Sequence, residues 1–236
     1  MLGLLWASGC GASSSDLHGL ELALGAASSL GLVTSLAMDA ISAPTACAQV
    51  VAGCTSFPCS GEVSITLGAD CPLPLGGVAS GTVDVSGSWS SADSATLSTT
   101  FVQVAAGGRT EVVVAAHDLT VDRSTTSVTV KYVGQNVSVV GASTLTNQSS
   151  WTVVSDPTAG LTVSGTNQNV GGAAVDQLSV SSVVIAPACA ANPSSGSATI
   201  QHVSTFSIVQ DSVSFHSACD GSADVNGKPV AFQFLQ

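Results

Sequence analysis

Apolar and polar residues alternate with a period of two along most of this chain, from about residue 48 to the C-terminus. Val63, Ile65 and Leu67 alternate with polar neighbours, and Val213 and Phe215 do the same much later. Such alternation buries one face of a strand and leaves the other face in water. The pattern therefore predicts β-strands over most of the sequence.

Residues that favour turns separate the alternating segments. They stand at Gly76-Gly77, Ser91-Ala92-Asp93, Gly107-Gly108, Asp122-Arg123-Ser124, Asp156-Pro157, Gly171-Gly172, Asn192-Pro193 and Asn226-Gly227. Asn226-Gly227 is the strongest hairpin signal, because both residue types accept the positive φ of a tight turn. The spacing predicts a mainly β fold, an antiparallel meander of about a dozen strands in a sandwich or half-barrel.

A helical pattern precedes the strands, over residues 16–41. Asp16 is a suitable N-cap, and Leu20, Leu24 and Ala27 recur on one helical face. We therefore expect three parts in the chain. They are a signal remnant and tether (residues 1–15), a helical segment that packs on the sheet (16–46) and a single β-domain (47–236).

Seven cysteines are present, an odd number, and Cys10 stands far from the others. The remaining cysteines are Cys47, Cys54, Cys59, Cys71, Cys189 and Cys219. One modified cysteine and six paired ones account for this count, and disulfides persist in oxidising compartments. The cysteines therefore predict a location outside the cytoplasm.

Cys10 follows the small residues Ala7-Ser8-Gly9 and an apolar stretch that begins at Met1. This segment resembles the end of a bacterial lipoprotein signal peptide, in which a cysteine after small residues is lipidated. The resemblance implies a lipid on Cys10, attachment to a membrane through that lipid, and an outer-membrane lipoprotein that is periplasmic or surface-exposed. It implies no enzymatic activity.

The expected strands restrict the disulfide pairing. If residues 48–53 and 62–67 form a hairpin, Cys59 and Cys71 flank one strand and lie about 25 Å apart at 3.3 Å per residue. A disulfide needs Cα atoms within about 7 Å, so these two cannot pair. The consistent set is Cys54–Cys59, Cys47–Cys71 and Cys189–Cys219, one of fifteen possible connectivities.

Charge excludes one class of partner. Four Lys and Arg residues oppose fifteen Asp and Glu residues, for a net charge of −11. Such a chain repels phosphate backbones, so we expect no nucleic-acid partner. After Cys10 no apolar run is long enough for a transmembrane helix.

Catalytic and cofactor motifs are not evident. The sequence contains no Gly-x-Ser-x-Gly, phosphate-loop or His-Glu-x-x-His motif. His117-Asp118 suggests a hydrolytic triad, but adjacent strand residues point to opposite faces. His202 and His216 are possible cross-strand neighbours that could share a metal, with no third ligand evident. We expect no enzyme, metal or cofactor.

Two further features favour structural interpretations. Residues 220–227 place oxygen ligands at alternate positions, as calcium loops do, but they lack the distal bidentate carboxylate. A turn followed by a hairpin is favoured there. Trp89 and Trp151 could be sugar-stacking platforms, yet an isolated strand tryptophan more often packs in a core.

These features favour a non-enzymatic envelope lipoprotein with a surface-displayed β-domain in a binding or scaffolding role. Its ligand, a small molecule or a protein, is not specified by the sequence. Two alternatives stay open. A helix followed by a meander resembles half-barrel carriers of lipids or lipoproteins, in which a curved sheet wraps an apolar cavity. Strands of about ten residues also fit a transmembrane β-barrel.

Overall fold

The computed structural model describes a thirteen-stranded antiparallel sheet in which every strand pairs with its sequence neighbours. The described residues are 17, 20, 23–25, 27, 47–53, 56–72, 78–106, 109–124, 127–140, 143–156, 158–169, 175–189, 191, 193–203 and 208–232. The predicted mainly β meander is therefore confirmed.

A short first strand is followed by six long ones, which succeed one another through the sheet. They are β1 (Ala48–Ala52), β2 (Cys59–Pro72), β3 (Val78–Ser91), β4 (Ser94–Ala106), β5 (Arg109–Arg123), β6 (Val128–Val140) and β7 (Ser143–Asp156). The remaining strands shorten toward the C-terminus. They are β8 (Gly160–Asn169), β9 (Val175–Ile185), β10 (Ser195–Val203), β11 (Ile208–Phe215), β12 (Ser222–Val225) and β13 (Lys228–Ala231).

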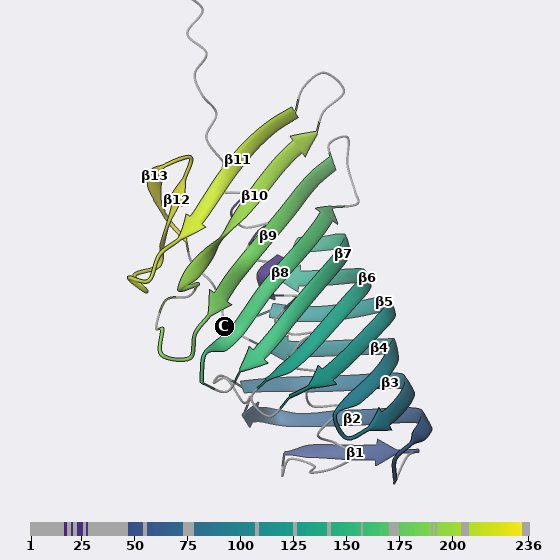
Figure 1. The fold of residues 1–236 in the computed structure, drawn as a ribbon. Coiled ribbons are helices and arrows are strands. Elements are labelled where there is room, and N and C mark those ends of the chain that lie inside the picture. Colours follow the sequence, from purple (N-terminus) through teal and green to yellow (C-terminus); the bar gives the residue numbers. More distant parts are fainter. Residues whose placement is uncertain are drawn as a thin grey trace, which may run out of the picture.

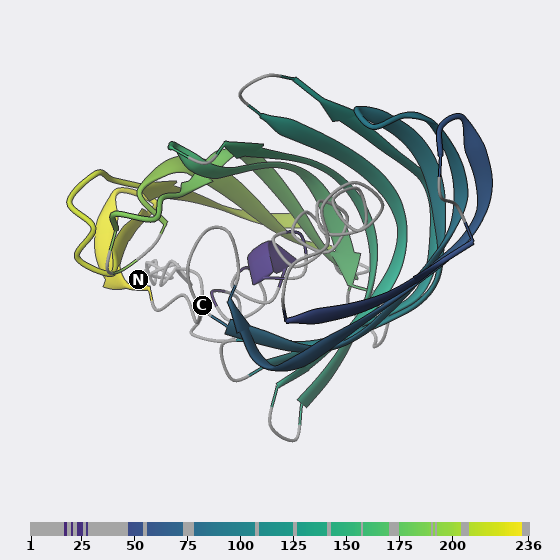
Figure 2. The same cartoon turned by 90° about the horizontal axis from the view of Figure 1, so that it is seen from below.

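Among the described strands, the sheet is a single curved surface whose outermost members are β1 and β13 (Figure 1). Seen from below, it curls around a helical segment that lies on its concave side (Figure 2). β-Bulges interrupt the ladder at several pairs, for example between Val163 and Gly165 of β8. Bulges and the intrinsic strand twist bend a sheet, so they explain how one sheet surrounds its own core.

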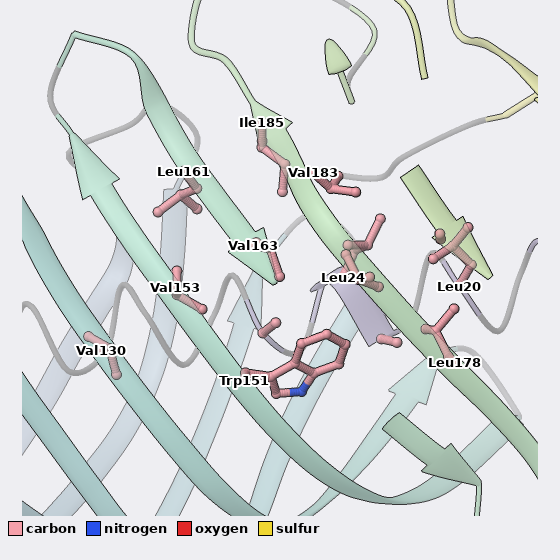
Figure 3. Close-up of a cluster of buried hydrophobic side chains, with 14 of the residues drawn as sticks. Leu20, Leu24, Val130, Trp151, Val153, Leu161, Val163, Leu178, Val183 and Ile185 are labelled. Carbon is pink, nitrogen blue, oxygen red and sulfur yellow. The ribbon is translucent and has the colours of Figure 1, made fainter. Parts of the chain in front are cut away.

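The hydrophobic core fills this concave side. Leu20 and Leu24 belong to the helical segment, have 1% and 0% of their surface exposed, and cluster with apolar strand residues. Figure 3 shows the two leucines beside Trp151, Leu178 and neighbouring strand residues. The described residues between 17 and 27 are helical, as the apolar spacing predicts. Tertiary packing of this kind offsets the low helix propensity of the glycines in the segment.

The predicted alternation is observed in the strands that suggested it. Val63, Ile65 and Leu67 are 0–4% exposed, and Val213 and Phe215 are 1% and 7% exposed. Their polar neighbours face the convex side. One face of the sheet is thus apolar and concave, and the other is polar and convex, as one-sided burial requires.

Two predicted disulfides are confirmed. Cys47 pairs with Cys71, and Cys189 pairs with Cys219. The first closes the β1–β2 hairpin, in which Ala48 lies opposite Leu67. The second joins the connection after β9 to the turn after β11, because the intervening β10–β11 hairpin returns the chain to the same end of the sheet. Cys59 is also disulfide-bonded, but Cys54, its predicted partner, lies outside the described residues.

Trp151 is fitted against a glycine on the next strand. Gly165 of β8 lies opposite Trp151 of β7 and has φ of +149°, a backbone angle that residues with a side chain rarely adopt. A Cβ at Gly165 would lie 2.1 Å from the Ser150 carbonyl oxygen and 2.7 Å from the Trp151 ring. Only glycine lets the buried indole lie this close to the strand.

Candidate functional site

Five glutamines lie side by side across five consecutive strands on the convex face. The register pairs Gln148 with Gln168, Gln168 with Gln177, Gln177 with Gln201, and Gln201 with Gln210. All five are exposed or half-buried. We call them the glutamine row. At the far end, Gln201 donates a hydrogen bond from Nε2 to Oε1 of Gln210 at 3.2 Å.

A second polar row runs parallel to the first, two residues away on each strand. Its members alternate between serine and threonine and are paired in the same way: Ser150, Thr166, Ser179, Thr199 and Ser212. We call it the hydroxyl row. Residues two apart on a strand share a face, so amides and hydroxyls form a polar lattice on this side of β7–β11.

A groove of about 420 Å³ lies between the two rows, over β7–β10. Four members of each row line it, together with Ser149, Asn167 and Leu178, which stand between the rows. The described lining residues are Gln148, Ser149, Ser150, Thr166, Asn167, Gln168, Gln177, Leu178, Ser179, Thr199 and Gln201. Its size lies within the range of small-ligand sites, about 300–1,000 Å³.

The lining identifies the side of the sheet on which the groove opens. Thr199 and Gln201 line it, whereas Ile200 between them does not. Ile200 is 4% exposed and belongs to the core, so its side chain points to the concave face. A groove that contacts both neighbours of Ile200 and misses Ile200 itself therefore lies on the convex face. Leu178 is also buried, and its strand, β9, forms part of the groove floor.

The groove is uncharged and rich in hydrogen-bonding groups. None of its described lining residues is acidic or basic. An amide side chain offers two N–H donors and a carbonyl acceptor, and a hydroxyl offers one donor and two lone pairs. The site can therefore hold a neutral molecule that both donates and accepts hydrogen bonds. Its described lining residues include no histidine, carboxylate or lysine, the side chains that most often act as general acids and bases.

The structure rules out the possible cross-strand pairing of His202 and His216, which the sequence did not favour. His202 lies opposite Val209 of β11, whereas His216 follows Phe215, which pairs with Gly196 at the other end of the β10–β11 hairpin. Six residues of strand separate these ends, or about 20 Å at 3.3 Å per residue. The two imidazoles therefore cannot share a metal. The β10–β11 register, which the sequence does not specify, decides this outcome.

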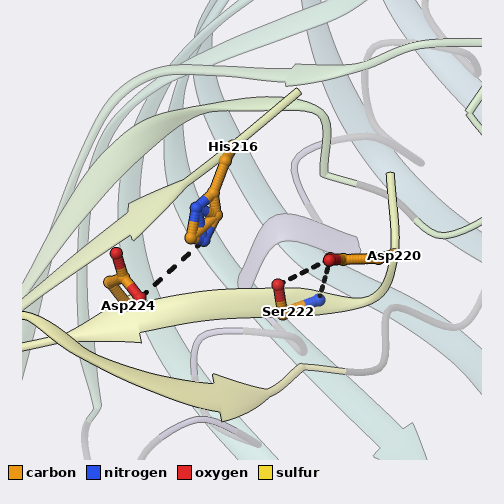
Figure 4. Close-up of polar contacts among 4 residues, drawn as sticks. All are labelled: His216, Asp220, Ser222 and Asp224. Carbon is orange, nitrogen blue, oxygen red and sulfur yellow. Dashed lines mark hydrogen bonds and ion pairs between the residues drawn. The ribbon is translucent and has the colours of Figure 1, made fainter. Parts of the chain in front are cut away.

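His216 instead faces Asp224 at the turn between β11 and β12 (Figure 4). Nε2 of His216 lies 3.9 Å from Oδ1 of Asp224, beyond hydrogen-bond reach, and each side chain is 37% exposed. Such an exposed pair contributes little to stability. Ser222 donates its hydroxyl to Oδ1 of Asp220 at 2.6 Å, so this hydroxyl is not directed to the imidazole.

Asp220 closes the turn that precedes β12. Its Oδ1 accepts from both the hydroxyl and the backbone N–H of Ser222, and these bonds hold the pKa of Asp220 below its usual range. This is the turn that the sequence favours over a calcium loop. In the described part of the chain, no three His, Cys, Asp or Glu residues gather as a metal site would require.

The two tryptophans in the described strands are core residues, as their isolation in strands suggests. Trp89 and Trp151 are 1% and 2% exposed, so neither offers a stacking face to a sugar. The indole nitrogen of Trp151 and Oδ1 of Asn167 are buried without a hydrogen-bond partner. Asn167 is opposite Ser149 on the concave face, two residues from the Trp151–Gly165 pair. The apolar core thus contains a small polar region.

Several predicted positions fall outside the described residues or their described side chains. Cys10, Cys54 and the expected leader are outside the description, and the side chains of His117 and Asp118 are not described. Among the helical residues that are described, none belongs to a helix with the length and apolarity needed to cross a membrane. The lipid on Cys10 stays a prediction.

Comparisons with protein-family models, curated proteins and solved structures find no match to this chain. The groove was missed by sequence reasoning, although each of its strands showed the polar half of the alternation. A glutamine in every strand from β7 to β11 was the available signal. It becomes a row only when five strands take the observed register.

Proposed function

We propose that this protein is a non-enzymatic lipoprotein of the bacterial cell envelope that binds a neutral ligand with the convex face of its β-domain. The observation that carries the binding role is the groove between the glutamine row and the hydroxyl row. Interior strands position both rows, so the backbone spacing of the groups that meet the ligand is set before binding. Preorganisation of this kind reduces the entropic cost of association.

The proposed location on the cell envelope is supported by the cysteines. Cys10 follows small residues, as in lipoprotein signal peptides, and Cys47–Cys71 and Cys189–Cys219 are disulfides. Disulfides persist where the environment is oxidising. Intact and reduced mass spectra of the protein from native membranes test this part. We expect a diacyl or triacyl mass on Cys10 and six oxidised cysteines. An unmodified Cys10 with free thiols would contradict the location.

Thiol labelling in native envelopes tests the binding face without knowledge of the ligand. Ser179→Cys places a thiol in the groove, and Ser98→Cys places one on β4, at a position that is also an exposed strand serine. We expect a maleimide to label both at similar rates in purified protein. In envelopes, an occupied groove should slow the labelling of Ser179→Cys only. Equal slowing of the two variants would reject the groove as the binding face.

A carrier of an apolar ligand is a second candidate function. It is favoured by the curved sheet and by the buried, unpartnered polar atoms of Trp151 and Asn167, which the polar head of a bound lipid could satisfy. Against it, Leu20 and Leu24 occupy the concave side in the described structure. A carrier therefore requires the helical segment to move away before the ligand enters.

A further inference from the structure

We propose that the ligand of the groove is a neutral polysaccharide chain that lies across strands β7–β11, along the glutamine row. This inference rests on the proposed binding function and specifies its ligand class. A neutral sugar carries many hydroxyl groups, each of which donates and accepts hydrogen bonds. The amides and hydroxyls of the two rows offer the same mixture of donors and acceptors on both sides of the groove.

The repetition of the rows indicates a repeating ligand. Adjacent strands are about 4.8 Å apart, so the five glutamines present like amides at that interval over about 19 Å. Within the described structure, the amides of Gln148, Gln168 and Gln177 make no side-chain hydrogen bond, which leaves them available. A polymer that repeats its hydroxyls can use several of these groups, whereas a single small molecule would use one or two.

Other linear polymers fit less well. An extended peptide joins a sheet at an edge strand, where backbone groups are unpaired, but β7–β10 are interior strands bonded on both sides. Nucleic acids and anionic polysaccharides need cations, and the described groove residues include no Lys or Arg. The net charge of −11 adds repulsion toward any polyanion. A neutral chain meets none of these obstacles.

Because the tryptophans of the described strands are buried, we expect polysaccharide binding that involves no aromatic stacking. Many sugar sites stack a ring on an aromatic face, but Trp89 and Trp151 lie in the core and do not line the groove. Binding should therefore rest on hydrogen bonds and depend little on ionic strength, because no charge pair is formed. Tryptophan emission should stay unchanged when the polysaccharide binds.

Calorimetric titration of the full chain with neutral glucan oligosaccharides of two to eight sugars tests the proposal. We expect affinity to rise with length until the chain spans the row and then to level off. Gln177→Ala should weaken the longest oligosaccharide about fivefold, as the loss of a hydrogen bond worth about 1 kcal/mol implies. Gln49→Ala, an exposed glutamine on β1, is the matched control and should leave affinity unchanged.

Each outcome of this titration has a distinct meaning. The oligosaccharides are derived from cellulose, starch or laminarin. Saturable binding of any of them would support the proposal if Gln177→Ala weakens that binding and Gln49→Ala does not. Binding of none of them, or equal loss in both variants, would overturn it. If Ser179→Cys is nevertheless protected in envelopes, the groove binds another ligand and the proposed function survives. If Ser179→Cys is also unprotected, both the polysaccharide proposal and the proposed function are contradicted.

Discussion

Asn226 shows how much one side chain can fix in this fold. It begins the β12–β13 turn with φ of +51°, and Gly227 follows with φ of +76°. Its Oδ1 accepts from the Ser212 backbone N–H at 2.9 Å, and its Nδ2 donates to the carboxylate of the buried Asp211. The residue therefore joins the turn to β11 as well as shaping it.

Asn226→Gly and Asn226→Ala separate these two roles. Glycine keeps the positive φ and loses the side-chain bonds, whereas alanine loses both. Because Asp211 is 3% exposed, either change leaves a buried carboxylate without this donor. We expect urea unfolding to show a loss of about 2 kcal/mol for Asn226→Gly and about 1 kcal/mol more for Asn226→Ala. Equal stability of the glycine variant and wild type would show that the side-chain bonds contribute nothing.

Only part of this residue-scale detail was predictable. Asn226-Gly227 identifies a tight turn from local chemistry, since its two residues accept positive φ wherever they occur. The bond to Asp211 was not predictable, because it depends on how β11 aligns with β12. The core positions of Trp89 and Trp151, by contrast, were expected from their isolation in strands, and the burial of both confirms them.

At the scale of elements, the β7–β8 hairpin depends on an ionised aspartate. Oδ1 of Asp156 accepts from the backbone N–H groups of Thr158 at 2.7 Å and Ala159 at 2.9 Å. These bonds favour the carboxylate, and they hold the pKa of Asp156 below its usual range, first through Ala159 and then through Thr158. The turn that ends strand β7 is thereby coupled to pH.

The direction of the pKa shift of Asp156 determines how stability depends on pH. A carboxyl group whose pKa is lower in the folded state adds stability above its unfolded pKa, and the contribution is lost as pH falls through the folded value. The turn should therefore loosen only in acid, below about pH 4. Carbon NMR titration of Asp156 should give a midpoint below that of the same residue in a peptide of residues 153–162. Identical midpoints would mean that the turn bonds do not form in solution.

The glutamine row is the element-scale feature that sequence reasoning could not supply. The five glutamines stand at unequal intervals along the chain, because the row lies close to the β8–β9 and β10–β11 connections and far from those at the opposite ends of the strands. A slip of one residue in any pair would send one glutamine to the concave face. The β8 bulge between Val163 and Gly165 also shifts the pairing of β8 with β9, and no residue pattern locates it.

At the scale of the whole molecule, one sheet both encloses a core and presents a polar outer face. The sequence predicted the meander but allowed a sandwich or a half-barrel, because both use the same alternation. The described strands form one continuous curved sheet around the helical segment (Figure 2). Leu20 and Leu24 take the place that a second sheet fills in a sandwich.

Leu24→Ala tests whether the helical segment belongs to the core. Leu24 is 0% exposed, so truncation should leave a cavity and lower the free energy of unfolding by about 3 kcal/mol, within the range for buried leucines. Chemical denaturation gives the value, and Leu17→Ala, at a half-buried position, should cost less. A loss below about 0.5 kcal/mol at Leu24, the size typical of surface sites, would show that the segment is not packed in the sheet.

One NMR experiment distinguishes most directly between a convex binding face and an apolar carrier. Labelled protein is titrated with a neutral glucan oligosaccharide and, separately, with laurate, while the glutamine side-chain amides and the Trp151 indole N–H are followed. We predict that the glucan shifts the side-chain amide signals of Gln168 and Gln177 and leaves the signals of Gln49 and Trp151 unchanged. We predict that laurate shifts none of these signals. A shift of Trp151 by laurate, with the glutamine row unmoved by either ligand, would contradict this account and favour the carrier.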